Sequence, residues 1–199
     1  MGRATAISFA KAGAEGLALG ARSDLSSVET EIYAAAQSVG KKAPKVLKLK
    51  IDVGEQESAE SASKAIENEF GRLDILINNA GFLSDFAPLI DTDPVKWWMN
   101  YELNLKGVYL VTRSLLPLML KGGEKTIINV SSIGALSITP GASGYQPSKH
   151  ALLRFTEFIC ADYAKDGVLA YCIHPGGVKS DLSMKMPEAV RASMYPLSK

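Results

Sequence analysis

The chain of 199 residues is long enough for one sizeable hydrophobic core, and we expect a single domain over residues 1–199. Lysine and arginine number 22, aspartate and glutamate 21, so no charge excess points to nucleic acid or to an acidic partner. The two cysteines form no C-x-x-C motif and no histidine cluster at metal-ligand spacing, which predicts a reduced protein without a disulfide framework or a bound metal. No run of about 18 apolar residues and no signal-peptide pattern occurs, so we expect a cytoplasmic protein with no membrane partner.

The predicted elements alternate between helix and strand from the first residues. MGRATAISFAKAGA has apolar residues at helical spacing and predicts an opening helix, and the apolar GLALGA predicts a buried strand over 16–21. Ser26, with Glu29 three residues later, predicts a capping box at the start of a helix that Gly40 ends. The alternating KVLKLKIDV predicts a strand over 45–53.

The alternation continues to the end of the chain. Helices are predicted over 58–70, about 93–120 and 145–165, and strands over 73–78, 125–130 and 168–173. Because the strands are almost wholly apolar, they are typical of a parallel sheet that is covered on both faces. The predicted fold class is α/β, a Rossmann-like doubly wound parallel sheet.

Such a sheet binds its ligand at the carboxyl ends of its strands. The residues that follow the predicted strands are nearly all polar or glycine: Ala21 and Arg22, Asp52 and Val53, 78–81, Ser131 and Ser132, and 174–177. We therefore expect the functional site along this edge of the sheet.

YQPSK places Tyr145 and Lys149 four residues apart on one face of a helix. A phenol titrates near pH ~10, and a nearby ammonium favours the phenolate, which suits a general acid/base. Alone, such a pair is more often a solvated surface pair. Ser132, thirteen residues earlier at a strand end, supplies a hydroxyl that could bond a carbonyl oxygen held beside the phenol.

At these residues the sequence resembles the short-chain dehydrogenase/reductase family. Four motifs stand in the family's order and spacing, from Gly2 to about Asp181: NNAG at 78–81, NVSS at 129–132, YQPSK at 145–149 and HPGGVKSD at 174–181. The resemblance implies four catalytic residues, which are Asn104, Ser132, Tyr145 and Lys149.

The resemblance also implies a role for each. Tyr145 exchanges a proton with the substrate oxygen, and Ser132 orients that oxygen. Lys149 holds the nicotinamide ribose and lowers the pKa of the tyrosine, while Asn104 holds a water in the proton relay. Ser131 is the less favoured serine, and we expect no specific role for the His174 imidazole.

The implied cofactor site takes in residues along the same edge: Gly2, Arg22, Ser23, Asp52, Val53, Asn79, Ala80, Gly81, Tyr145, Lys149, Pro175, Gly176, Val178 and Ser180. An acidic residue after the strand over 16–21 would bind the ribose of NAD, whereas Ala21 and Arg22 stand there. Because arginine suits a 2′-phosphate, we expect NADP(H), with NAD as the alternative if Arg22 only faces solvent.

A tryptophan pair and a methionine pair can each be interpreted in two ways. Trp97 and Trp98 either form the floor of a hydrophobic pocket or pack the start of a helix. Met184 and Met186 lie where the family has a mobile lid, or else on an amphipathic helix that packs on the core.

Gly2 matches the third glycine of the family's T-G-x-x-x-G-x-G fingerprint. We therefore expect a sheet truncated at both ends, without the family's first and last strands. The flanking strands would face each other across a gap, where each buried unpaired backbone group costs about 1–3 kcal/mol.

The residues favour an oxidoreductase that transfers a hydride between NADP(H) and a ketone or secondary alcohol. The expected assembly is a homodimer or homotetramer. The alternative is a catalytically inactive truncated product, or a decoy subunit of such an enzyme. Steroid, polyketide, sugar and quinone substrates all stay open.

Overall fold

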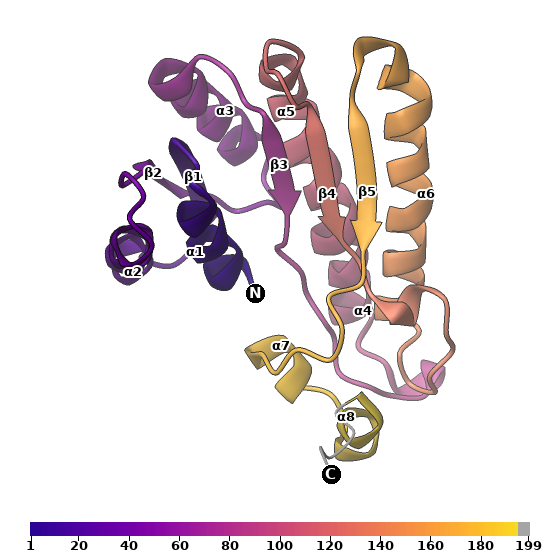
Figure 1. Ribbon diagram of the computed structural model, residues 1–199. Coiled ribbons are helices and arrows are strands. Elements are labelled where there is room, and N and C mark those ends of the chain that lie inside the picture. Colours follow the sequence, from indigo (N-terminus) through magenta and orange to yellow (C-terminus); the bar gives the residue numbers. More distant parts are fainter. Residues whose placement is uncertain (195–199) are drawn as a thin grey trace.

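The computed structural model describes residues 1–194, and its elements follow the predicted alternation (Figure 1). The helices are α1 (Gly2–Ala12), α2 (Ser26–Ser38), α3 (Gln56–Phe70), α4 (Pro94–Tyr101), α5 (Gly107–Leu120), α6 (Tyr145–Tyr163), α7 (Asp181–Met184) and α8 (Glu188–Met194). The strands are β1 (Gly16–Ala21), β2 (Lys45–Lys50), β3 (Ile75–Asn78), β4 (Thr126–Val130) and β5 (Leu169–Ile173). The α/β class with parallel strands is confirmed.

The strands form two separate parallel sheets. One pairs β1 with β2, and the other has the order β3-β4-β5. Figure 1 shows the β1–β2 pair set apart from the three-stranded sheet. Among the described residues β1 and β3 are not hydrogen-bonded to each other, so the expected gap in the sheet is observed between these two strands.

Two hydrophobic clusters form the core, and both sheets contribute to the larger one, since Ala18, Leu47 and Leu49 of β1 and β2 pack against it. On the β1–β2 pair, α1 and α2 bury mainly small side chains, among them Ala6, Ala10 and Ala36 around Ile32. The larger core lies between the three-stranded sheet and helices α3, α5 and α6, and it includes Met119, Ile127 and Ile159. The β1–β2 pair and the three-stranded sheet are therefore joined by side-chain packing in the larger cluster and not by strand pairing.

One face of β5 is open, contrary to the expectation that both sheet faces are covered. Ala170 and Cys172 face α6, where Cys172 contacts Thr156. The alternate residues Leu169, Tyr171 and Ile173 are 50%, 51% and 42% exposed. Strand alternation places these three on the opposite face, which the described residues leave accessible to solvent.

The predicted capping box at Ser26 is wrong. Ser26 is the first residue of α2, and it donates from both its backbone N–H and its hydroxyl to the Asp24 carboxylate, at 3.3 and 2.9 Å. Glu29 instead pairs with Lys48. An ionised carboxylate is a stronger acceptor than a hydroxyl, and Lys48 draws Glu29 away from the backbone.

The predicted helix over 93–120 is divided by a π-helical segment. Asp93 caps α4 by accepting from the backbone N–H groups of Val95 and Lys96 at 2.8 and 3.2 Å. The π-helix then covers Glu102–Lys106, before α5 begins. Such π-bulges are rare and occur frequently at functional sites, and this one contains Asn104.

Candidate active site

Ser132 and Tyr145 meet where β4 ends and α6 begins. Ser132 caps the short 3-10 turn Ile133–Ala135, and its hydroxyl oxygen accepts from the Gly134 N–H at 3.1 Å. The Ser132 hydroxyl is also near enough to the Tyr145 phenol to lower the pKa of that phenol. The two hydroxyls suggested by the sequence are therefore brought together.

Tyr145 is almost fully buried, at 8% exposure. Burial raises the pKa of its phenol, and the Ser132 hydroxyl lowers that pKa by less. The expected decrease caused by Lys149 is not met, because the ammonium lies 6.0 Å from the ring centroid and bonds elsewhere. At neutral pH the phenol is protonated, and it can donate a proton.

Lys149 lies one helical turn after Tyr145 and is 4% exposed. Its ammonium donates to the carbonyl of Val130, the last residue of β4, at 2.8 Å. Burial lowers the pKa of Lys149 to about 8, while an interaction with Cys172 raises it by less. Ser131 donates to the backbone carbonyl of Lys149 at 3.2 Å, so its hydroxyl is used to fix α6.

Asn104 joins the loop after β3 to α6. Its side chain is fully buried, and Nδ2 donates to the carbonyl of Phe82 at 2.9 Å and to the hydroxyl of Ser148 at 3.0 Å. Its Oδ1 accepts from the Phe82 N–H at 2.7 Å. The side chain thus clamps both backbone groups of one residue, and the water-holding role of Asn104 stays a prediction.

The residues after β3 border this cluster. A Cβ atom on Gly81 would lie 3.3 Å from Asn104 Oδ1 and 3.7 Å from Lys149 Nζ. Asn79 lies close to the start of α1, since a Cβ atom on Gly2 would be 3.1 Å from Asn79 Nδ2. Ala80 is exposed between them. The glycine therefore keeps open a space beside two catalytic candidates.

Arg22, Ser23, Asp52 and Val53 lie at the ends of β1 and β2. The Arg22 side chain is 75% exposed, and Nη1 lies 4.0 Å from Asp52 Oδ2. Ser23 is also exposed, whereas Asp52 accepts from the Gly54 N–H at 3.0 Å. Val53 packs against α5 at Gly107. Arg22 and Ser23 are accessible to an anionic group, while Asp52 and Val53 form the adjoining wall.

The loop after β5 carries Pro175, Gly176, Val178 and Ser180. Gly176 has φ +80°, which favours glycine, and its carbonyl accepts from the Val178 N–H at 3.0 Å. Ser180 caps α7, since its hydroxyl oxygen accepts from the Ser183 N–H at 3.2 Å. The loop is thus held by its own hydrogen bonds and leads directly into α7.

The expectation that the His174 imidazole has no specific role is wrong. Its Nδ1 accepts from the Ile133 N–H at 3.0 Å, and Ile133 is the residue after Ser132. Acceptance at Nδ1 places the proton of the neutral ring on Nε2. The motif HPGG gave no signal for this bond, because the two residues are 41 positions apart in the chain.

Trp97 fits both readings of the tryptophan pair, because it also lines a surface hollow with Ser84 and Lys96. Trp97 is half-buried and donates from Nε1 to the Ser143 hydroxyl at 3.2 Å, whereas Trp98 is 55% exposed. Trp97 therefore packs α4 against the residues before α6. Of the two methionines, Met184 ends α7 and is exposed, and Met186 is half-buried just beyond it.

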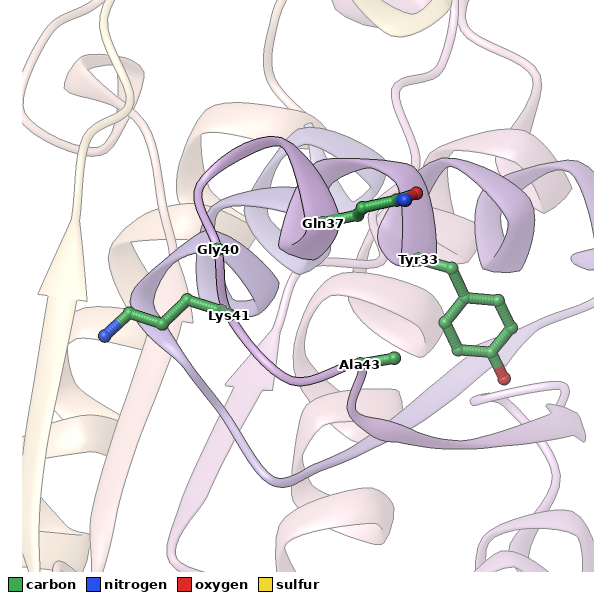
Figure 2. Close-up of a pocket in the computed structure, with 5 residues that line it drawn as sticks. All are labelled: Tyr33, Gln37, Gly40, Lys41 and Ala43. Carbon is green, nitrogen blue, oxygen red and sulfur yellow. The ribbon is translucent and has the colours of Figure 1, made fainter.

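A surface hollow elsewhere contains none of these residues. Figure 2 shows its lining of Tyr33, Gln37, Gly40, Lys41 and Ala43, which belong to α2 and to the loop before β2. This loop precedes the amino end of β2, opposite the strand ends that carry the candidates. Over residues 1–194 the structure contains no helix suited to crossing a membrane and no group of three potential metal ligands.

Comparisons with known proteins agree with the geometry. A profile of the short chain dehydrogenase family matches residues 1–191. The chain is 54% identical over 194 residues to the short chain dehydrogenase mpl6 of Monascus purpureus, covering 98% of this chain and 66% of the relative. It is 33% identical over 181 residues to a cyclopentanol dehydrogenase of a Comamonas species, covering 89% of this chain and 72% of that protein.

Solved structures of short-chain dehydrogenase type share this fold. A short chain dehydrogenase of Shigella flexneri complexed with NADP has a TM-score of 0.79 at 25% identity, covering 99% of this chain and 77% of that one. Carveol dehydrogenase from Mycobacterium avium, in complex with NAD, has a TM-score of 0.80 at 21% identity, covering 92% and 68%. The chain spans about two thirds of the length of the curated relative mpl6.

Proposed function

Because the chain belongs to the short-chain dehydrogenase family, we propose that it is an oxidoreductase that transfers a hydride between NADP(H) and a ketone or secondary alcohol. One observation carries this proposal: the Ser132 hydroxyl is near the buried Tyr145 phenol, and the buried Lys149 lies one helical turn after Tyr145 on α6. The name of the related cyclopentanol dehydrogenase, a secondary-alcohol enzyme, supports the substrate class.

The residues present fit a phosphorylated nicotinamide dinucleotide. The missing Cβ of Gly81 leaves space beside Lys149 Nζ, whose one hydrogen bond within the described residues goes to Val130. An ammonium has three donors, so Lys149 can also bind ribose hydroxyls. Arg22 and Ser23 offer an exposed guanidinium and hydroxyl to a 2′-phosphate. When bound, the cofactor supplies the hydride.

The chain's own residues supply the proton. Tyr145 donates its phenolic proton to the oxygen of a ketone, and Ser132 holds that oxygen by a second hydrogen bond. Asn104 keeps Phe82 in place, and with it the Gly81 backbone beside Lys149. The phenol is protonated at neutral pH and so has a proton to give to a ketone oxygen, and burial makes it a weaker acid than a free tyrosine.

The second candidate is an inactive product or a decoy subunit. The gap between β1 and β3 is the observation that motivates it, whereas the comparisons with known proteins do not favour it. This candidate predicts a chain that binds neither dinucleotide on its own.

Location and assembly are further parts of the proposal. Cys160 and Cys172 are free thiols, which suits the reducing cytosol. Tyr109 on α5 and Phe158 on α6 are 45% and 59% exposed, and these apolar side chains suit a helix-to-helix contact in a homodimer or homotetramer. Light scattering on the purified chain measures the assembly.

The experiment is a fluorescence titration of NADPH and of NADH into the purified chain, with circular dichroism as the check of folding. NADPH oxidation with cyclopentanone then measures turnover. We expect NADPH to bind more tightly than NADH, and Tyr145→Phe to lower kcat by about 10²–10⁴-fold without weakening NADPH binding. A folded chain that binds neither dinucleotide would favour the decoy, and full turnover by Tyr145→Phe would remove the assigned proton donor.

A further inference from the structure

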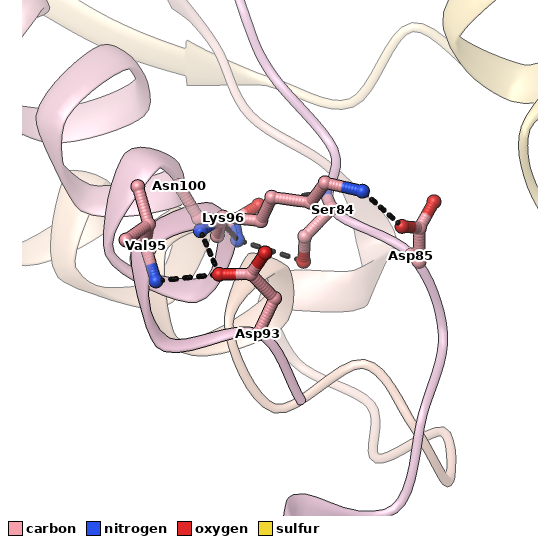
Figure 3. Close-up of polar contacts among 6 residues, drawn as sticks. All are labelled: Ser84, Asp85, Asp93, Val95, Lys96 and Asn100. Atoms are coloured by element: carbon pink, nitrogen blue, oxygen red, sulfur yellow. Dashed lines mark hydrogen bonds and ion pairs between the residues drawn. The ribbon is translucent and has the colours of Figure 1, made fainter. Parts of the chain in front are cut away.

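The segment 82–85 follows the Asn79–Gly81 wall and runs along α4 and the π-helix. Three side chains spaced four residues apart hold it, so they lie on one helical face: Lys96 bonds Asp85, Asn100 bonds Ser84 and Asn104 bonds Phe82. Figure 3 shows the first two of these contacts. The segment is therefore held mainly by the two buried asparagines, Asn100 and Asn104, while the Lys96–Asp85 pair is exposed and contributes little.

Asn100 makes the central contact and is fully buried. Its Nδ2 donates to the Ser84 hydroxyl at 2.9 Å, and its Oδ1 accepts from the Ser84 N–H at 3.3 Å. Nδ2 also lies 3.2 and 3.0 Å from the carbonyls of Lys96 and Trp97, one turn back on α4. The amide is thereby fixed in one orientation and grips Ser84 by both its backbone and its side chain.

Asn100 also lies against the residue before the proposed proton donor. A Cβ atom on Gly144 would be 2.6 Å from Asn100 Nδ2, a distance that real Cβ atoms do not reach. The same position would be 3.2 Å from the carbonyl oxygen of Trp97, whose ring bonds Ser143. Asn100 thus lies between Ser84 and Gly144, and so links the segment 82–85 to the start of α6.

The other side of the segment faces α7. The Lys185 ammonium lies 5.9 Å from the centre of the Phe82 ring, and Leu182 Cδ1 is 4.0 Å from the Cβ position of Gly81. The segment therefore forms a wall between α4 and α7, and Gly81, which directly precedes it, borders Lys149.

We propose that Asn100 is a positioning residue that sets the distance between this wall and Tyr145, and thereby the fit of the carbonyl substrate. The inference rests on the proposed function. Asn104 holds Phe82 and the dinucleotide side of the segment independently, so loss of Asn100 frees Ser84 without freeing Gly81. Loss of the Asn100 side chain should therefore raise the KM for the substrate and leave the Kd of the dinucleotide unchanged.

The test compares Asn100→Ala and Asn100→Asp with Lys96→Met in the full chain. Lys96→Met removes the exposed neighbouring contact, and a surface ion pair contributes little. Asn100→Asp keeps the acceptor for the Ser84 N–H and loses the donor to its hydroxyl. The readouts are hydrogen exchange in peptides covering 82–87 and 142–147, the Kd for NADPH, and KM and kcat for cyclopentanone.

For Asn100→Ala we expect about tenfold faster exchange in both peptides and about a tenfold higher KM, since a buried two-bond contact is lost. The Kd for NADPH should stay within about twofold, and Lys96→Met should match the parent in all readouts. Asn100→Asp should give exchange rates and a KM between those of the parent and Asn100→Ala. If Asn100→Ala does not fold, the same comparison is made with Asn100→Asp. Unchanged exchange, or a Kd that weakens as much as KM rises, would overturn the inference.

The outcome separates the two proposals. If the parent chain does not turn over cyclopentanone, the proposed function loses its support, and the exchange data alone decide whether Asn100 couples Ser84 to Gly144. If the parent is active and Asn100→Ala exchanges as slowly as the parent, the positioning role is wrong and the proposed function is unaffected.

Discussion

The two sheets of the molecule are built differently. Around β3, β4 and β5, buried polar side chains bond one another: Asn78 donates to Asn129 at 2.8 Å, and Asn129 donates to Thr156 at 2.8 Å. Around β1 and β2 the core consists mostly of alanines, and the charged pairs, such as Arg22 with Asp52, lie in solvent. The residues proposed for proton transfer thus lie on strands and helices that buried hydrogen bonds hold in place. The preference for NADP(H) over NAD(H), in contrast, depends on exposed charged side chains, which can be substituted with little effect on the fold.

The largest expected effect is at Lys149. Lys149→Met should lower kcat/KM by at least about 100-fold, since it removes the buried ammonium proposed to bind the ribose hydroxyls and so to position the dinucleotide. The same variant also tests how the stability of the folded chain depends on pH. With a folded pKa of about 8, Lys149 releases its proton at lower pH in the folded chain than in the unfolded one. The unfolded state then binds more protons, so stability rises from about pH 8 to about pH 10. Urea unfolding should show this rise in the parent and a smaller one in Lys149→Met; equal slopes would contradict it.

The framework of buried hydrogen bonds is tested at Asn129. Asn129→Ala removes the acceptor for Asn78 and the donor to Thr156 in a fully buried position. We expect a loss of about 2–4 kcal/mol in the free energy of unfolding, because buried polar groups lose partners. Urea denaturation measures it. The matched control is Asp91→Ala on the exposed turn Leu89–Asp91, which should leave the midpoint unchanged.

The contribution of the β1–β2 pair to dinucleotide binding is tested at Arg22. Arg22→Ala should weaken NADPH binding by about tenfold and leave NADH binding unchanged, because the guanidinium faces solvent and pairs only loosely with Asp52. Arg3→Ala, which removes another exposed arginine, on α1, is the control. Fluorescence titration of both dinucleotides gives the ratio. An equal loss of affinity for NADH would mean that Arg22 does not bind the 2′-phosphate.

The smallest expected effect is at His174. Loss of its bond to the Ile133 N–H should loosen the turn that Ser132 begins, and His174→Ala should lower kcat by about fivefold. His174→Asn should recover most of that loss, because the asparagine Oδ1 can occupy the place of Nδ1, whereas His174→Phe should not. Steady-state kinetics on the three variants decides, and equal rates for Asn and Phe would argue against the hydrogen bond.

The predictable parts of the fold depend on local rules. Helical spacing placed α1 and α6, apolar runs placed the strands, and the four-residue spacing of Tyr145 and Lys149 put both on one face. The capping of α2 by Asp24 was missed because two acceptors competed within a few residues. The bonds of Asn100 to Ser84 and of His174 to Ile133 join positions 16 and 41 residues apart, and no local pattern encodes them.

The hydrogen-bonded series from Asn78 to Thr156 also bears on the order in which the parts of the chain fold. It joins groups 51 and 27 residues apart, and β4 pairs with β5 only once Leu169–Ile173 exists. By contrast, α1, β1, α2 and β2 all lie within the first 50 residues. During synthesis, the half carrying Arg22 can fold while the other is still being made. We expect the half that carries Tyr145 to fold later, because its paired strands are farther apart in the sequence than β1 and β2 are.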